Sequence, residues 1–142
     1  VKGSLLDTSI VSELRKGARC DAQVAAWYDG IAEAELYLSV LVVGEIRRGI
    51  ERLRQRDPPQ ALRLEGWLLA LKDQCRRRIL GLPIEAAELW GCFDLDRPVP
   101  PIDGLLAATA MYHDLVLVTR HVDDVAVTGV STCNPFDSRR TL

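Results

Sequence analysis

The sequence of 142 residues lacks any apolar run long enough to span a bilayer, and no two of its four cysteines have C-x-x-C spacing. The first absence argues against a membrane protein. The second argues against a zinc site and against the disulfide framework of a secreted domain. Residues 1–4 are too short and too polar for a secretory signal. We therefore expect a cytoplasmic protein with reduced, mostly buried thiols and no membrane partner.

Lysine is scarce, with three residues against 15 arginines, and the formal net charge is only −2. No overall basic field therefore attracts nucleic acid. The arginines are instead clustered at positions 47, 48, 52, 54 and 56 and again at 76–78. Guanidinium groups suit forked contacts to phosphate or carboxylate, although a solvated helix face is the more frequent meaning of such runs.

Repeats and low-complexity segments are absent, and the length fits one domain over residues 1–142 with one core. Short apolar runs predict strands at residues 5–6, 35–40, 79–82, 115–119 and 127–132, with helical patterns between them. Strands that alternate with helices predict an α/β fold, a three-layer α/β/α sandwich with a mostly parallel central sheet. The two long helices between residues 44 and 78 form a hairpin that is larger than a simple crossover needs.

Several local features of the helices can also be predicted. Thr8 or Ser9 is expected to N-cap the first helix, and Asp21 the second. In the hairpin, Trp67 is expected to belong to the core. If an apolar groove exists there instead, it would accept an amphipathic helix. Trp90 is expected to face inward from the helix that Pro83 starts.

Acidic residues follow several of the predicted strands. Asp7 ends the first strand, and Glu45 lies about one turn into the helix after the second. Asp103 opens the helix after a proline-rich loop, and Asp123 and Asp124 follow the strand at 115–119. Each could instead cap a helix or face solvent. The carboxyl ends of parallel strands share one edge of a sheet, however, so these side chains are expected to converge.

Converging carboxylates repel one another, and some would have to stay protonated unless a cation is bound. A set of carboxylate oxygens selects Mg²⁺ or Mn²⁺ over zinc or copper. Such a cation polarises a phosphodiester and lowers the pKa of an attacking water. The acidic residues therefore predict a metal-dependent phosphodiesterase.

Four segments together resemble the motifs of PIN-domain ribonucleases, and in particular VapC-type toxins of bacterial toxin–antitoxin pairs. They are residues 6–14, 38–49, 102–110 and 118–120, which follow one another in order over nearly the whole chain. The resemblance implies a PIN-like fold and an Mg²⁺- or Mn²⁺-dependent endoribonuclease. It also implies a homodimer that is silenced by a cognate antitoxin whose tail covers the acidic pocket.

The resemblance also implies roles for individual residues. Asp7, Glu45 and Asp103 would be catalytic acids that bind the metal, with Asp124 as the fourth. The hydroxyl groups of Thr8, Ser39 and Thr119 would orient these ligands or water.

The sequence departs from the family pattern after Thr119-Arg120, where the family commonly has Asn or Asp and this chain has His121. The fourth acidic position is therefore open between Asp124 and Asp123, and so is the presence of a second metal. His121 either orients a water or a phosphate or has no role in the reaction.

Three other functions remain as alternatives. A phosphatase of the haloacid dehalogenase type needs Asp-x-Asp, but Ser9 stands at the second position. A dinucleotide-binding domain needs a glycine-rich turn after the first strand, and none is present. A catalytically weak or inactive PIN-like binding module is the third alternative, against which the intact Asp7, Glu45 and Asp103 argue.

Overall fold

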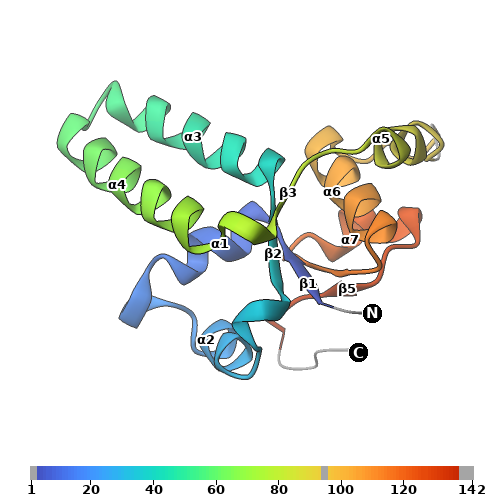
Figure 1. The fold of residues 1–142 in the computed structure, drawn as a ribbon, viewed down its shortest axis with the longest axis horizontal. Helices are drawn as coiled ribbons and strands as arrows, with labels where there is room; N and C mark the ends of the chain where they lie inside the picture. Colours follow the sequence, from blue (N-terminus) through green and yellow to red (C-terminus); the bar gives the residue numbers. More distant parts are fainter. Residues whose placement is uncertain (1–2, 94–95, 138–142) are drawn as a thin grey trace.

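The computed structural model describes residues 3–93 and 96–137 and is organised around a five-stranded sheet (Figure 1). The strands are β1 (Ser4–Leu6), β2 (Leu36–Ser39), β3 (Ile79–Leu80), β4 (Val116–Val118) and β5 (Thr132–Cys133). They lie in the order β3-β2-β1-β4-β5, and each neighbouring pair is parallel. The prediction of a mostly parallel sheet is confirmed.

Helices cover the sheet on both sides. They are α1 (Thr8–Leu14), α2 (Ala22–Asp29), α3 (Val40–Arg54), α4 (Pro58–Gln74), α5 (Ile84–Gly91), α6 (Pro101–Tyr112) and α7 (Val122–Val125). In Figure 1, α1, α3 and α4 lie to the left of the strands, and α5, α6 and α7 lie to the right. This arrangement is the α/β/α sandwich that the alternation of strands and helices predicts.

The core lies where strands β1 and β4 meet the helices on either side. Leu5 of β1 and Leu117 of β4 are almost completely buried, as are Ile10 of α1 and Leu106 of α6. Strands buried on both faces read as continuous apolar runs, which explains the composition of β1 and β4. Because β1 is central, the residue that follows it is placed at the middle of the carboxyl edge of the sheet.

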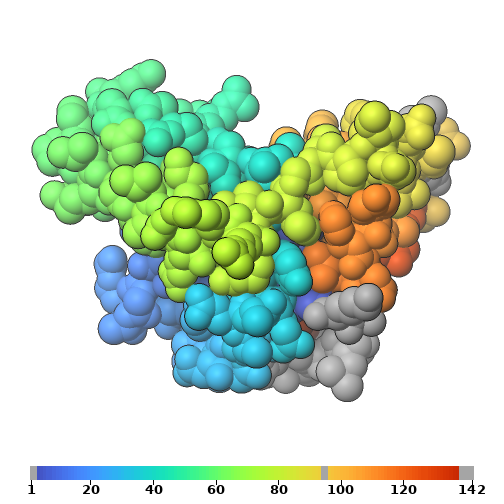
Figure 2. Space-filling view, viewed as in Figure 1, coloured from blue at the N-terminus to red at the C-terminus, as the bar shows by residue number. Residues whose placement is uncertain are grey.

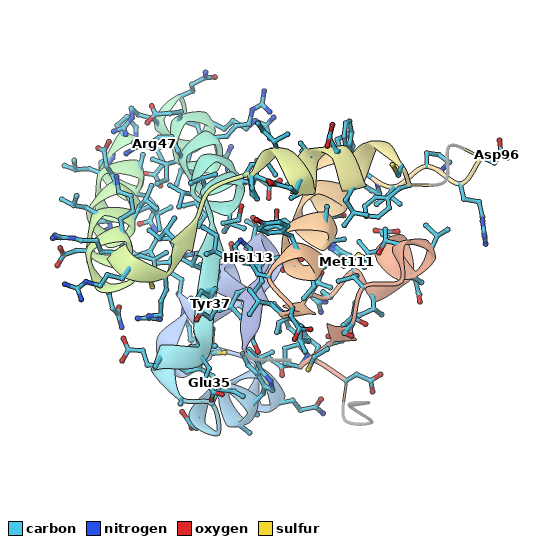
Figure 3. All side chains as sticks on the ribbon, turned by 45° about the vertical axis from the view of Figure 1, so that its right-hand side comes forward. Glu35, Tyr37, Arg47, Asp96, Met111 and His113 are labelled. Atoms are coloured by element: carbon cyan, nitrogen blue, oxygen red, sulfur yellow. The ribbon has the colours of Figure 1, made fainter. Side chains whose placement is uncertain are left out.

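The hairpin of α3 and α4 extends away from the sheet (Figure 1), as predicted. Asp57 ends the turn between the two helices and N-caps α4, where its side chain accepts a hydrogen bond from the backbone N–H of Gln60 at 3.2 Å. Pro58 then occupies the first turn of α4, where a missing N–H costs nothing. In Figure 3, Arg47 lies in this hairpin, apart from Met111 and His113 at the end of α6.

A cavity of about 350 Å³ lies between α1, α2 and α4. Its apolar lining includes Leu14, Tyr28, Trp67 and Leu71. Trp67 is half-buried and packs against the core at the same time, so the prediction that it belongs to the core is only partly correct. Across the described residues, no helix combines the length and the apolar character that crossing a membrane requires.

Three local predictions are wrong. The N-cap of α1 is Asp7 rather than Thr8 or Ser9. Trp90 is 40 % exposed, although its ring still lies against Gly104 of α6. Three of the cysteines are only partly buried, and Cys92 is exposed.

The last strand is displaced from its predicted position at 127–132. Residues Ala126–Thr128 form a turn of 3-10 helix, and Gly129 follows with a positive φ of 82°. The Thr128 hydroxyl donates to the carbonyl oxygen of Val125 at 2.7 Å and accepts from the N–H of Val130 at 3.2 Å. Such local side-chain bonds compete with strand pairing, and β5 begins only at Thr132.

Candidate metal centre

Asp7 follows β1 directly and is 3 % exposed. Its Oδ1 accepts hydrogen bonds from the backbone N–H of Ile10 at 3.2 Å and from the hydroxyl of Ser9 at 2.6 Å. The same side chain therefore caps α1 and stands at the carboxyl edge of the sheet. The two interpretations of Asp7, as a helix cap and as a site residue, do not exclude each other.

Thr119 follows β4 and holds the other oxygen of Asp7. Its hydroxyl donates to Asp7 Oδ2 and accepts from the backbone N–H of His121 at 2.9 Å. The hydroxyl oxygen accepts from that N–H through a lone pair, and the one hydroxyl proton is donated to the carboxylate. Thr119 thus holds one oxygen of the Asp7 carboxylate.

Asp103 lies in the first turn of α6. Its Oδ2 is 3.8 Å from His121 Nδ1, which is itself 4.0 Å from Asp7 Oδ2. One ligand atom from each of Asp7, Asp103 and His121 lies within 4.8 Å of the others. Three segments that are far apart in the sequence therefore bring two carboxylates and an imidazole together.

Glu45 lies beside this group without being part of the close cluster. Its Oε1 accepts a hydrogen bond of 2.5 Å from the hydroxyl of Thr8, the residue next to Asp7. Ser39 has a different contact, since its hydroxyl accepts from the N–H of Leu41 at 3.0 Å and caps α3. Within the described part of the chain, Ser39 makes no hydrogen bond to the carboxylates.

Asp123 and Asp124 both lie in the first turn of α7 and are exposed. They differ in their effect on the site, because the charge of Asp124 acts on Asp103 and that of Asp123 is not among the causes of its pKa shift. Asp124 is therefore the better placed of the two. His121, which the sequence left without an assigned role, is closer to Asp7 and Asp103 than its exposed loop position indicates.

The pKa of Asp103 is raised, and burial is the largest cause. The charge of His121 opposes this shift, whereas the carboxylates of Asp7, Asp124 and Glu45 increase it. Four carboxylates are thus close enough to repel one another, and a dication would relieve that repulsion. The donor set consists of carboxylate oxygens with one imidazole at its rim, and it fits a hard divalent cation.

Comparison with known proteins gives a consistent result. Residues 4–124 match the family model described as the PIN domain. A VapC ribonuclease of Sinorhizobium fredii is 31 % identical, with 94 % of this chain and 97 % of the relative covered. The toxin FitB of Neisseria gonorrhoeae is 30 % identical, with 93 % and 97 % covered.

Solved structures agree with these relatives. The crystal structure of FitAcB from Neisseria gonorrhoeae superposes with a TM-score of 0.85 at 27 % identity and covers 94 % of this chain and 98 % of that one. A structure of FitAB bound to a DNA fragment gives a TM-score of 0.79 at the same identity, with 94 % and 96 % covered. The fold is therefore shared along almost the full length of both chains.

Proposed function

This chain belongs to the PIN-domain family, and from that premise we propose that it is an endoribonuclease that hydrolyses RNA phosphodiester bonds with Mg²⁺ or Mn²⁺. The observation that carries the proposal is the convergence of Asp7, Asp103 and His121 within 4.8 Å, from three separate segments. The relatives that are named as ribonucleases and toxins support it. We assign residues 1–142 to a single nuclease domain.

Asp7, Asp103 and Glu45 would hold the cation, with Asp124 as a fourth acid from α7. When bound, a divalent ion supplies charge that polarises the phosphodiester and lowers the pKa of the attacking water. The protein keeps the acids in place: Thr119 orients Asp7, and Thr8 orients Glu45 through its 2.5 Å hydrogen bond. Partners that orient metal ligands in this way commonly change metal affinity or activity by about 10–100-fold when removed.

His121 has a position suited to proton transfer or phosphate binding. Its Nδ1 faces both Asp7 and Asp103, and its side chain is 47 % exposed. A half-exposed imidazole beside the carboxylates can donate a hydrogen bond to a phosphate oxygen or take a proton from water. We therefore include His121 among the groups that touch the substrate.

We further propose that the protein is the toxin of a toxin–antitoxin pair, that it acts in the cytoplasm as a homodimer, and that a cognate antitoxin silences it. Solved neighbours include toxin–antitoxin complexes, among them one from Klebsiella pneumoniae. The cavity between α1, α2 and α4 gives an apolar site, lined by Leu14, Trp67 and Leu71, at which an amphipathic helix of such a partner would bury its apolar face.

The test is an RNA-cleavage assay with the metal removed by EDTA and then restored as Mg²⁺ or Mn²⁺. We expect cleavage to stop on chelation and to return on addition. The variants Asp7→Asn and Asp103→Asn should abolish cleavage, whereas Asp123→Asn, an exposed acid on α7, should retain it. Cleavage that persists in EDTA or in Asp103→Asn would contradict the metal-dependent reaction.

The alternative is an inactive PIN-like module that acts only by binding RNA or protein. It predicts that the wild-type protein cleaves no RNA with either metal, and that Asp7→Asn inhibits growth of an expressing cell as strongly as the wild type. Nuclease activity that is lost in Asp7→Asn together with growth inhibition would exclude it.

A further inference from the structure

A groove of about 540 Å³ runs along α3 past Glu45, which lies beside the acidic cluster. Its lining on α3 includes Gly44, Glu45, Arg48, Gly49 and Arg52, and Ile102 closes it beside Asp103. We call it the α3 groove. Figure 2 shows the surface hollowed between α3 and the pair formed by α5 and α6.

We propose that the α3 groove binds the backbone of a single-stranded RNA segment next to the bond that is cleaved, with Arg48 and Arg52 contacting its phosphates. This inference rests on the proposed ribonuclease function and assigns a substrate-positioning surface to it. It makes Arg48 and Arg52 positioning residues, which set where the RNA lies along the carboxylates.

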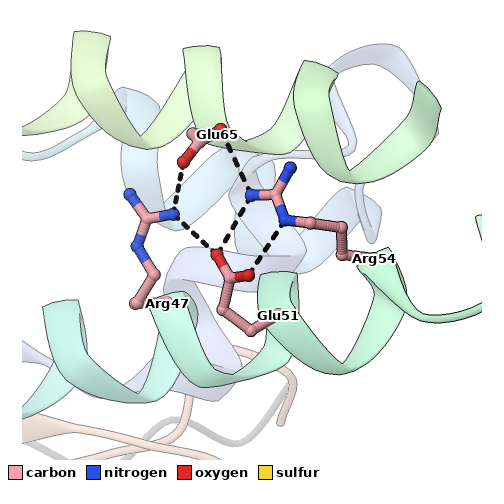
Figure 4. A network of polar contacts seen from close by, with 4 residues as sticks. All are labelled: Arg47, Glu51, Arg54 and Glu65. Carbon is pink, nitrogen blue, oxygen red and sulfur yellow. Dashed lines mark hydrogen bonds and ion pairs between the residues drawn. The ribbon is translucent and has the colours of Figure 1, made fainter. Parts of the chain in front are cut away.

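The first support is that these two arginines have no partner within the protein. Among the described residues, no hydrogen bond or ion pair involves the guanidinium group of Arg48 or Arg52, and both side chains are exposed. Arg47 and Arg54 of the same helix are instead held by Glu51 and Glu65 (Figure 4), with contacts of 2.6–3.2 Å. Only the groove side of α3 therefore offers free guanidinium groups to an anion.

The second support is the spacing along the helix. Glu45, Arg48 and Arg52 are separated by three and then four residues, so they form one row on a single face. With a rise of about 1.5 Å per residue, Arg48 and Arg52 lie about 4.5 and 10.5 Å beyond Glu45 along the helix axis. If one phosphate of a nucleic acid strand lies at the acidic site, the next phosphates along that strand can therefore reach both arginines.

The third support is the bare floor of the groove. A Cβ atom added at Gly44 or Gly49 would meet no other atom within 4 Å, so packing within the chain does not require glycine at either position. Glycine inside a helix lowers its stability. Glycine at these two positions lets a ligand approach the backbone of α3 closely. Gly66 of α4 is equally open but lies outside the groove, which makes it a control position.

An acidic protein segment could also pair with two arginines. RNA is favoured because the proposed reaction requires a phosphodiester at the carboxylates. The neighbouring phosphates of that RNA must then lie on the surface that borders the carboxylates. The α3 groove is that surface, since Glu45 and Ile102 belong both to its lining and to the edge of the site. Guanidinium forks match phosphate oxygens in a bidentate manner.

The experiment compares two double variants of the same helix with the same change in net charge, Arg48→Gln/Arg52→Gln and Arg47→Gln/Arg54→Gln. The probe is a fluorescein-labelled oligouridylate, and its anisotropy is measured in EDTA over a range of salt concentrations. Loss of two phosphate contacts should lower the magnitude of the slope of log K against log salt by about 1.4, at roughly 0.7 per contact for a single strand. We expect the groove variant to bind about tenfold more weakly at low salt and the other variant to bind like the wild type.

Cleavage kinetics give a second measurement. The groove variant should show a higher KM with a nearly unchanged kcat, because the carboxylates are intact and only RNA placement is weaker. Arg48→Lys/Arg52→Lys keeps the charge and should restore the salt slope, but only part of the affinity, because the forked contact is lost.

Equal RNA binding by the groove variant and the wild type would overturn the proposal. So would a groove variant that binds RNA normally but has lost affinity for a polyglutamate peptide, because the surface would then serve an acidic protein. These results differ from a failure of the proposed function, in which the wild type would cleave no RNA with Mg²⁺ or Mn²⁺. The binding comparison between the two variants remains decisive in that case.

Discussion

Helix α3 has two faces that use the same kinds of side chain in opposite ways. On the side toward α4, Arg47 and Arg54 are tied to Glu51 and Glu65, and each charge is neutralised by a neighbour (Figure 4). On the other side, Glu45 and the free Arg48 and Arg52 line an open groove next to the acidic cluster. The first face joins two helices, whereas the second has charges that no part of the described chain neutralises.

Within one basic run, arginines that are paired inside the protein can therefore be told apart from arginines that are available to a ligand. Sequence alone gives both faces the same composition. The ion pairs separate them, because among the described residues of this helix they form only on the side toward α4, where they lower the pKa of Glu51 to about 2 and raise that of Arg47. Unpaired charges next to converging carboxylates are candidates for substrate contact, and paired ones are candidates for stability.

The largest expected effect distinguishes the two faces by substitution of one glutamate on each. Glu45→Gln should lower RNA cleavage by at least about 100-fold, since removal of even a residue that only orients a metal ligand can cost that much. Glu65→Gln removes a carboxylate from the paired face and should leave cleavage unchanged. The measurement is the rate of RNA cleavage at saturating Mg²⁺, with circular dichroism to verify that both variants are folded. Equal loss in the two variants would mean that the faces do not differ in function.

The second prediction concerns the floor of the groove. Gly49→Leu should block the close approach of RNA and weaken binding of the oligouridylate about tenfold, an effect of about 1.4 kcal/mol. Gly66→Leu is the matched control in α4. Both variants should raise the free energy of unfolding by about 0.5–1 kcal/mol, because glycine is replaced within a helix where a Cβ atom has open space. If Gly49→Leu is stabilised but binds RNA normally, the groove floor is not in contact with substrate.

The approach of Asp7 to Asp103 could be predicted from the sequence because both lie at helix starts, which a parallel sheet gathers at its carboxyl edge. The position of Asp7 after a short apolar run, and of Asp103 in the first turn of an alanine-rich helix, indicates a shared sheet edge once a parallel sheet is assumed. The α/β class follows from the same alternation. The edge strand was misplaced because the hydrogen bonds of Thr128 favour a turn over a strand, and these bonds depend on the backbone conformation around Gly129.

Other features could not be derived from sequence for a physical reason. The choice between Asp123 and Asp124 depends on the direction in which one short helix, α7, presents neighbouring side chains. His121 and Asp7 are 114 positions apart, and only the pairing of β1 with β4 brings them to 4.0 Å. For the same reason, the sequence does not predict which arginines of α3 form ion pairs, because this depends on the position of α4.

The third prediction sharpens the comparison on the paired face. Arg47→Met removes a guanidinium that bridges Glu51 and Glu65, so the contact between α3 and α4 should weaken. The groups are exposed, and solvent screening makes the loss small. We expect a slightly lower urea midpoint than that of the wild type and unchanged RNA binding. The difference in midpoint should be smaller at high salt. Arg48→Met should show the reverse pattern, with an unchanged midpoint and weaker binding of RNA.

The smallest effect is the pH dependence of the paired face. Arg54 is the main cause of the low pKa of Glu51, followed by Arg47, and they hold it at about 2 against an ordinary value of 4.5. Because the folded-state pKa is the lower one, Glu51 stabilises the fold above pH 4.5, and this contribution disappears as the pH falls toward about 2. The wild type should therefore have a higher urea midpoint than Glu51→Gln at neutral pH, and the two midpoints should converge near pH 2. A difference that stays constant over this range would show that Glu51 acts through packing and not through its charge.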